Sequence, residues 1–171
     1  AKDGASYFAR FRKPEGGGVL DWRREAIKLE RLVRACDTGP RRNPFAAAKL
    51  LVGKGAWLVR AAVAVGDEGE NQAPGTVTAI GEGRVEVATA RGRLKLTRCD
   101  ALDGSAESLA ETIRKLGLGV GSILPMLDDD TLRRLDESLA RSGRHETRWA
   151  NLLAGFEALD LLPPPRDTGR P

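Results

Sequence analysis

Three short segments in the middle of the chain alternate apolar and polar residues, as half-buried β-strands do. They cover residues 76–80, 84–89 and 93–97, and glycine-containing turns separate them. Alternation with a period of two places the apolar side chains of each strand on one face of a sheet. Because the turns are short, the segments predict an antiparallel meander whose apolar face must be covered by other parts of the chain.

Two further strands are expected before this meander. Residues 48–52 and 57–65 are rich in aliphatic residues and flank Gly53-Lys54-Gly55, which is typical of a tight turn. A two- or three-stranded sheet of this length would have exposed edges and too small a core, whereas five strands that curl on themselves avoid both problems. The pattern therefore predicts a small open OB-like β-barrel of about five strands.

A single amphipathic helix precedes the strands, so that the predicted fold class is α+β. Four apolar residues recur at the spacing of one helical face: Leu29, Leu32, Val33 and Cys36. Asp21 is expected to cap this helix at its N-terminus, and Gly39 and Pro40 supply the stop signal. The predicted helix spans residues 22–37.

The pattern after the strands is helical. Ser105 is expected to cap a helix that ends near Leu116, and the acidic residues 128–130 are expected to cap a second helix. This second helix should break or bend near Ser142-Gly143 before it continues over residues 146–153. The apolar residues of the loop 117–125 should pack back on the barrel.

The first 18 residues are predicted to be an extended linker, because they are rich in basic residues and end with three glycines. Tyr7, Phe8 and Phe11 are exceptions, and we expect them to lie against a neighbouring domain. The chain starts without Met, which suits a piece of a longer protein. No apolar run is long enough to span a bilayer and no leader opens the chain, so a cytoplasmic location is expected.

Motifs for catalysis and metal binding are weak. His145 is the only histidine, it lacks the second histidine of a His-Glu-x-x-His zinc motif, and it has no nucleophile at a recognisable spacing. Cys36 and Cys99 are interpreted as core thiols rather than a disulfide or metal ligands. We therefore expect neither a metal site nor a catalytic residue.

Several short motifs follow one another through residues 5–103. They are Ala5-Ser6-Tyr7-Phe8-Ala9 in the linker, Asp21-Trp22 ahead of the helix, the turn with Gly39-Pro40 and Asn43-Pro44, and Pro74-Gly75-Thr76-Val77 at the start of a strand pair. Together they resemble the C-terminal domain of formyltransferases of the methionyl-tRNA formyltransferase type. The resemblance implies a family signature with a structural role: Asp21, Trp22, Gly39, Pro40, Pro44 and Gly75.

The turn Asp37–Phe45 departs from the tRNA enzymes. It looks more like the formyltransferase-like domains of nonribosomal peptide synthetases, and His145–Trp149 resembles synthetase linker segments. The resemblance implies four regions, which are a linker from a missing catalytic domain, an OB-like domain, a helical extension toward a downstream domain and a disordered tail. In the same order they cover residues 1–18, 19–103, 104–162 and 163–171.

This resemblance implies an accessory domain that positions an acceptor and links the transferase to the next domain. Formyl-tetrahydrofolate would bind to the separate catalytic domain, so no cofactor is expected in this chain. The expected partners are that catalytic domain and a downstream synthetase domain, with an aminoacyl-loaded carrier protein as a possible acceptor and no membrane. The alternatives are a tRNA-binding OB-type module and a purely structural spacer.

Basic residues are the candidates for partner contact, since the formal net charge is +4 and the pI is near 9.4. Six residues in or beside the barrel are assigned to this role: Arg41, Arg42, Asn43, Lys49, Lys54 and Arg60. Five more basic residues lie on or next to the strands: Arg84, Arg91, Arg93, Lys95 and Arg98. Trp57 is the only aromatic residue on a strand, and we expect it in the core rather than stacked on a base. Three roles for the basic residues stay open, namely a solvated surface, a carrier or domain contact, and nucleic-acid binding.

Overall fold

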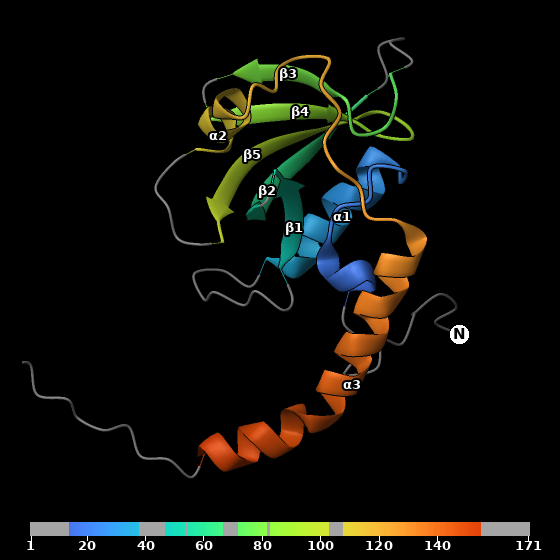
Figure 1. The fold of residues 1–171 in the computed structure, drawn as a ribbon, viewed down its shortest axis with the longest axis vertical. Coiled ribbons are helices and arrows are strands. Elements are labelled where there is room, and N and C mark those ends of the chain that lie inside the picture. Colours follow the sequence, from blue (N-terminus) through green and yellow to red (C-terminus); the bar gives the residue numbers. More distant parts are fainter. Residues whose placement is uncertain are drawn as a thin grey trace, which may run out of the picture.

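The computed structural model describes residues 14–37, 47–53, 55–66, 72–81, 83–102 and 108–154. It is an α+β structure with five strands, a short 3₁₀ turn and three α-helices (Figure 1). The elements follow in the order η1 (Glu15–Gly18), α1 (Ala26–Cys36), β1 (Ala48–Val52), β2 (Gly55–Val65), β3 (Val77–Gly81), β4 (Arg84–Ala88), β5 (Arg93–Ala101), α2 (Leu109–Lys115) and α3 (Asp129–Ala154).

All five strands belong to one antiparallel sheet with the order β1-β2-β5-β4-β3. The predicted meander is confirmed, because β3 pairs with β4 and β4 with β5. The predicted hairpin before it is confirmed as well, with Val52 opposite Gly55 at its closed end. Lys54 in that turn lies outside the described residues.

The two outer strands, β1 and β3, are not paired with each other in the described sheet, so the sheet does not close into a barrel. Short segments line both edges instead. Leu20 N donates to Lys49 O at 2.8 Å beside β1, and Val77 N donates to Ser122 O at 2.8 Å beside β3. Both segments occupy backbone groups that would otherwise be open to another chain. The OB-like barrel remains a prediction.

The core lies between the sheet, α1 and α2 (Figure 1). Its largest fully buried side chains include Trp22, Leu29, Leu50, Leu94, Leu96, Ile113 and Leu124. Trp57 is 4% exposed, which confirms its expected place in the core. Cys36 and Cys99 are free thiols, and burial raises the pKa of Cys99 to about 12, as expected of core thiols.

The predicted start of the first helix is wrong. The helix begins at Ala26, and Asp21 does not cap it, since its carboxylate accepts from Arg23 N at 3.1 Å and from Arg23 Nε at 2.8 Å. Ala26 N instead donates to Arg91 O at 3.0 Å. A long-range backbone contact therefore takes the place of the local cap. The amphipathic face of the helix is confirmed, since Leu29, Val33 and Cys36 are buried.

The later helices also differ in detail from the sequence prediction. The N-cap of α2 is Ser108, which forms a capping box with Glu111, whereas Ser105 lies outside the described residues. Asp128 caps α3 as expected, because its carboxylate accepts from Thr131 N at 2.7 Å. A break at Ser142-Gly143 does not occur, since α3 runs through these residues as one helix, although its axis curves along its length (Figure 1). One glycine costs a helix only about 1 kcal/mol, which a long helix tolerates.

The loop that follows α2 is only partly packed on the sheet. Leu124 is fully buried and Leu118 packs against the core, as the sequence predicted for this loop. Val120 and Ile123, in contrast, are 66% and 58% exposed. No helix in the described part of the chain has the length and apolar character of a membrane span.

The glycines that were expected to be part of an extended linker form a compact turn. Gly16, Gly17 and Gly18 have φ values of 58°, 64° and 79°, and all three are buried. A left-handed backbone of this kind is unfavourable for residues with a Cβ atom. Tyr7, Phe8 and Phe11 lie outside the described residues.

Candidate interaction surfaces

Lys49 is one of two predicted contact residues that the structure describes. Its ammonium donates to Gly17 O at 2.5 Å and to Ala47 O at 3.1 Å, and its side chain is half-buried. Burial lowers the pKa of this amine. Lys49 therefore joins η1 to β1 inside the chain, and its role in partner contact stays a prediction.

Arg60 is the second predicted contact residue that the structure describes, and its side chain is only 8% exposed. Its Nε donates to Asp100 Oδ2 at 3.0 Å. The pair lies where the register between β2 and β5 shifts, and such irregularities redirect side chains in a sheet. The other residues assigned to contact or signature in the turn and hairpin lie outside the described residues: Gly39, Pro40, Arg41, Arg42, Asn43, Pro44 and Lys54.

Three of the other basic residues on or next to the strands reach solvent. Arg84 and Arg91 are exposed, and so is Arg98, which approaches Asp37 at 3.9 Å. Lys95 lies next to Glu86 at 3.9 Å and is opposite Val63, which is 50% exposed. The sheet face opposite the core thus carries the exposed apolar residue Val63, with the charged residues Lys95 and Glu86 beside it.

Of the residues predicted to form a family signature, the structure describes Asp21, Trp22 and Gly75, and it brings Trp22 and Gly75 together. Trp22 is fully buried, and Trp22 O accepts from Ala90 N at 2.9 Å. Gly75 has a φ of 91°, and a Cβ atom there would lie 3.2 Å from both Leu124 O and Trp22 Cδ1. Only glycine combines this backbone with this close approach.

Asp21 makes stability depend on pH. Burial by itself raises the pKa of Asp21, but hydrogen bonds and charge from Arg23 outweigh it and hold that pKa below its usual value. Because the folded-state pKa is the lower one, ionised Asp21 stabilises the fold above the unfolded value of about 3.9, and this contribution disappears as the pH falls through the folded-state value.

We therefore expect Asp21→Asn to lower the free energy of unfolding at pH 7 and to have less effect once the pH falls below the folded-state pKa of Asp21. Urea denaturation of both proteins over this pH range measures the difference. Asp130→Asn is a matched control, since Asp130 forms an exposed ion pair with Arg133 that should add little stability. An Asp21→Asn effect that does not change with pH would contradict the assignment.

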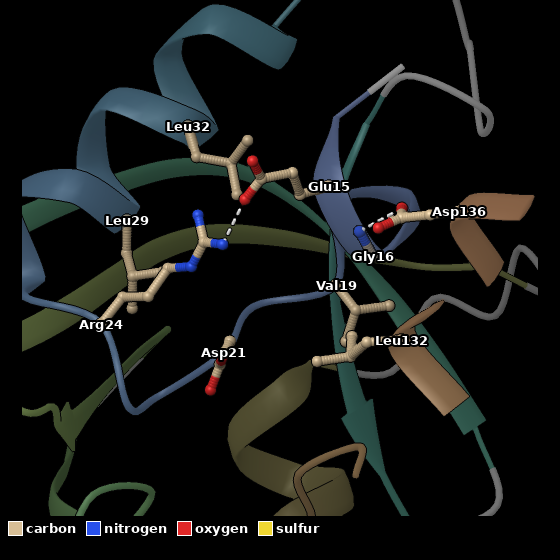
Figure 2. A pocket seen from close by; sticks show the side chains of 9 residues that line it. All are labelled: Glu15, Gly16, Val19, Asp21, Arg24, Leu29, Leu32, Leu132 and Asp136. Atoms are coloured by element: carbon tan, nitrogen blue, oxygen red, sulfur yellow. Dashed lines mark hydrogen bonds and ion pairs between the residues drawn. The ribbon is translucent and has the colours of Figure 1, made fainter. Parts of the chain in front are cut away.

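A cavity of about 110 Å³ lies between η1, α1 and α3 (Figure 2). Leu29, Leu32 and Leu132 contribute apolar walls, and Arg24 forms an ion pair with Glu15 at its edge. Asp136 points to Gly16, whose N–H it accepts at 2.7 Å. Its small size suits a few water molecules rather than a substrate.

A second, more apolar cavity of about 330 Å³ lies on the other side of η1. Its walls come from η1, β1 and α3: Gly16, Gly17, Val19, Lys49, Leu135, Ser138 and Leu139. Among the described residues, no three His, Cys, Asp or Glu side chains converge to hold a metal ion. The sequence does not predict these two cavities, because their walls come from segments more than 100 residues apart. The three adjacent glycines are the one local feature that could have indicated an unusual turn there.

The chain is similar to known proteins over most of the described part. The family described as formyl transferase, C-terminal domain, matches residues 15–117. A methionyl-tRNA formyltransferase of Halorhodospira halophila is 38% identical over 109 residues, which are 64% of this chain and 32% of that protein. A methionyl-tRNA formyltransferase of Paraburkholderia phytofirmans is 33% identical over 119 residues, 70% of this chain and 34% of that protein.

The chain thus spans about a third of the length of these relatives. The family match, in contrast, covers more than half of the chain and contains α1, all five strands and α2, whereas α3 lies outside it. By this match the chain belongs to the family of formyl transferase C-terminal domains.

Proposed function

We propose that this chain is a non-catalytic accessory part of a formyltransferase-like protein, in which it positions an aminoacyl acceptor and joins the transferase to the next domain. One observation carries this proposal. The chain matches only the C-terminal domain of formyl transferases, and the matched part is about a third of the length of the formyltransferase relatives. Formyl-tetrahydrofolate would then bind to a separate catalytic domain. The single histidine lies exposed on α3, which also favours a role outside catalysis.

The acceptor in this proposal is an aminoacyl group on a carrier protein of a nonribosomal peptide synthetase. Two observations support it. The turn Asp37–Phe45 and the segment His145–Trp149 resemble synthetase sequences, and α3 adds 26 residues beyond the family match. An OB-like domain over residues 19–103 and a cytoplasmic location are part of the same proposal.

A second candidate function is tRNA binding. It is favoured by the names of the relatives, which are methionyl-tRNA formyltransferases, and by the basic pI near 9.4. Exposed Arg84 and Arg91 would meet phosphates in that case. A spacer that binds neither partner is the third outcome.

Binding measurements with the carrier protein and with tRNA, each added to the purified chain, distinguish these functions. We expect an aminoacyl-loaded carrier protein to bind, and Arg84→Gln with Arg91→Gln to weaken it by about tenfold, because two steering charges are lost. Fluorescence anisotropy at about 0.05 and about 0.15 M salt measures carrier and tRNA in parallel. Arg133→Gln with Arg134→Gln on α3 is the charge-matched control, because it removes the same number of positive charges from exposed positions.

Each outcome decides between the candidates. Tight tRNA binding that falls steeply with salt would favour the tRNA module, since phosphate contacts release counterions. Binding of neither partner would favour the spacer. Transfer of a formyl group by this chain alone, with formyl-tetrahydrofolate as donor, would contradict a non-catalytic role.

A further inference from the structure

The turn η1 has a conformation that its own residues do not favour. Gly16, Gly17 and Gly18 are consecutive residues in the left-handed region, with φ values of 58°, 64° and 79°. Glycine adopts this region without steric strain, but it loses more backbone entropy on ordering than any other residue. Three such residues in a row therefore need contacts from elsewhere to stay ordered.

Helix α3 supplies one half of these contacts. Gly16 N donates to Asp136 Oδ1 at 2.7 Å, across 120 residues of sequence. Leu132 covers Gly16 so closely that a Cβ atom there would lie 2.6 Å from Leu132 Cδ2, and Leu139 covers Gly17. The other half comes from the β1 side, where Ala47 O faces Gly18 and Lys49 donates to Gly17 O.

The contact between α3 and the rest of the described chain is narrow. η1 is the element that α3 contacts most, and the ion pair of Asp129 with Arg23 beside it is exposed. A cavity of about 110 Å³ lies at the contact (Figure 2), and a second one of about 330 Å³ adjoins it. Residues that line a void lack dispersion partners on one side, and exposed ion pairs add little stability. Detachment of α3 should therefore cost far less than unfolding of the sheet.

We propose that α3 is a reversible latch on η1. In the docked state, α3 holds the glycine turn through which the chain enters the β-sheet domain. In the released state, η1 loses its order and the detached helix unwinds, because an isolated helix is only marginally stable in water, while the sheet, α1 and α2 stay folded. The core does not depend on α3, since Trp22, Leu29 and Leu94 are buried among elements of the family match, and α3 lies outside that match. This inference does not depend on the proposed acceptor.

Hydrogen–deuterium exchange of the full chain tests the latch. We expect Leu132→Ala and Asp136→Ala each to speed exchange in residues 14–19 and 129–140 by about tenfold, and by the same factor in both segments, while β2 and β5 keep their wild-type rates. Leu152→Ala is the control on the same helix, because Leu152 is 50% exposed and lies more than three turns beyond the contact.

Three results would overturn the proposal. Faster exchange of β2 and β5 by the same factor would make α3 part of the cooperative core. Faster exchange of α3 with no change in η1 would mean that α3 does not hold the turn. Wild-type rates in both segments of both variants would mean that Leu132 and Asp136 do not hold the latch closed.

Discussion

Trp22→Ala is expected to lower the free energy of unfolding by about 3–5 kcal/mol, the usual cost of removing a large buried aromatic side chain. Trp22 is 0% exposed and contacts the region where Gly75 and Leu124 meet the core. Because domains are stable by only about 5–15 kcal/mol in total, this variant should have a much lower denaturation midpoint. Urea denaturation followed by circular dichroism measures the change.

Two further variants separate the causes of this loss. Ile27→Ala on the exposed side of α1 should change stability by no more than about 0.5 kcal/mol, as surface substitutions do. Trp22→Phe should cost less than Trp22→Ala, since it keeps an aromatic ring and removes an indole N–H that has no hydrogen-bond partner among the described residues. A loss below about 1 kcal/mol for Trp22→Ala would show that the surrounding core closes around the missing side chain.

Gly18→Ala is the second variant with a large expected effect. Gly18 has a φ of 79°, and a Cβ atom there would lie 2.6 Å from Ala47 O, which is backbone and cannot rotate away. Gly83→Ala is the matched control, because Gly83 has a φ of 66° and open space around its Cβ position. Both variants should lose about 1–2 kcal/mol for the left-handed backbone.

Gly18→Ala should lose a further 1–3 kcal/mol or so, the usual cost of forcing an extra group into packed structure. Thermal and urea denaturation of both variants give the difference between them. Equal losses would mean that η1 moves away from β1 at little cost, and that the clash with Ala47 O is relieved by this shift.

Local patterns in the sequence were sufficient for most of the secondary structure. The alternation in residues 84–89 and 93–97 predicted β4 and β5, because side chains on a strand alternate between two faces whatever the strand pairs with. The face of α1 was predicted for the same reason, from the helical spacing of Leu29, Val33 and Cys36. The start of α1 was not predicted correctly, because Ala26 N at its N-terminus donates to Arg91 O and not to Asp21.

The family, too, was inferred from the sequence, from short motifs in residues 5–103, and the family match over residues 15–117 agrees with it. The candidate surfaces could not. Lys49 and Arg60 are basic, as residues of a binding surface often are. In the folded chain, however, Lys49 donates to Gly17 O and Arg60 donates to Asp100. The pairing of Gly16 with Asp136, 120 residues away, likewise has no local signal. Periodicity follows from the backbone of one element, whereas the neighbours of a charge or a glycine turn are set by how distant elements pack, and only the tertiary structure decides that.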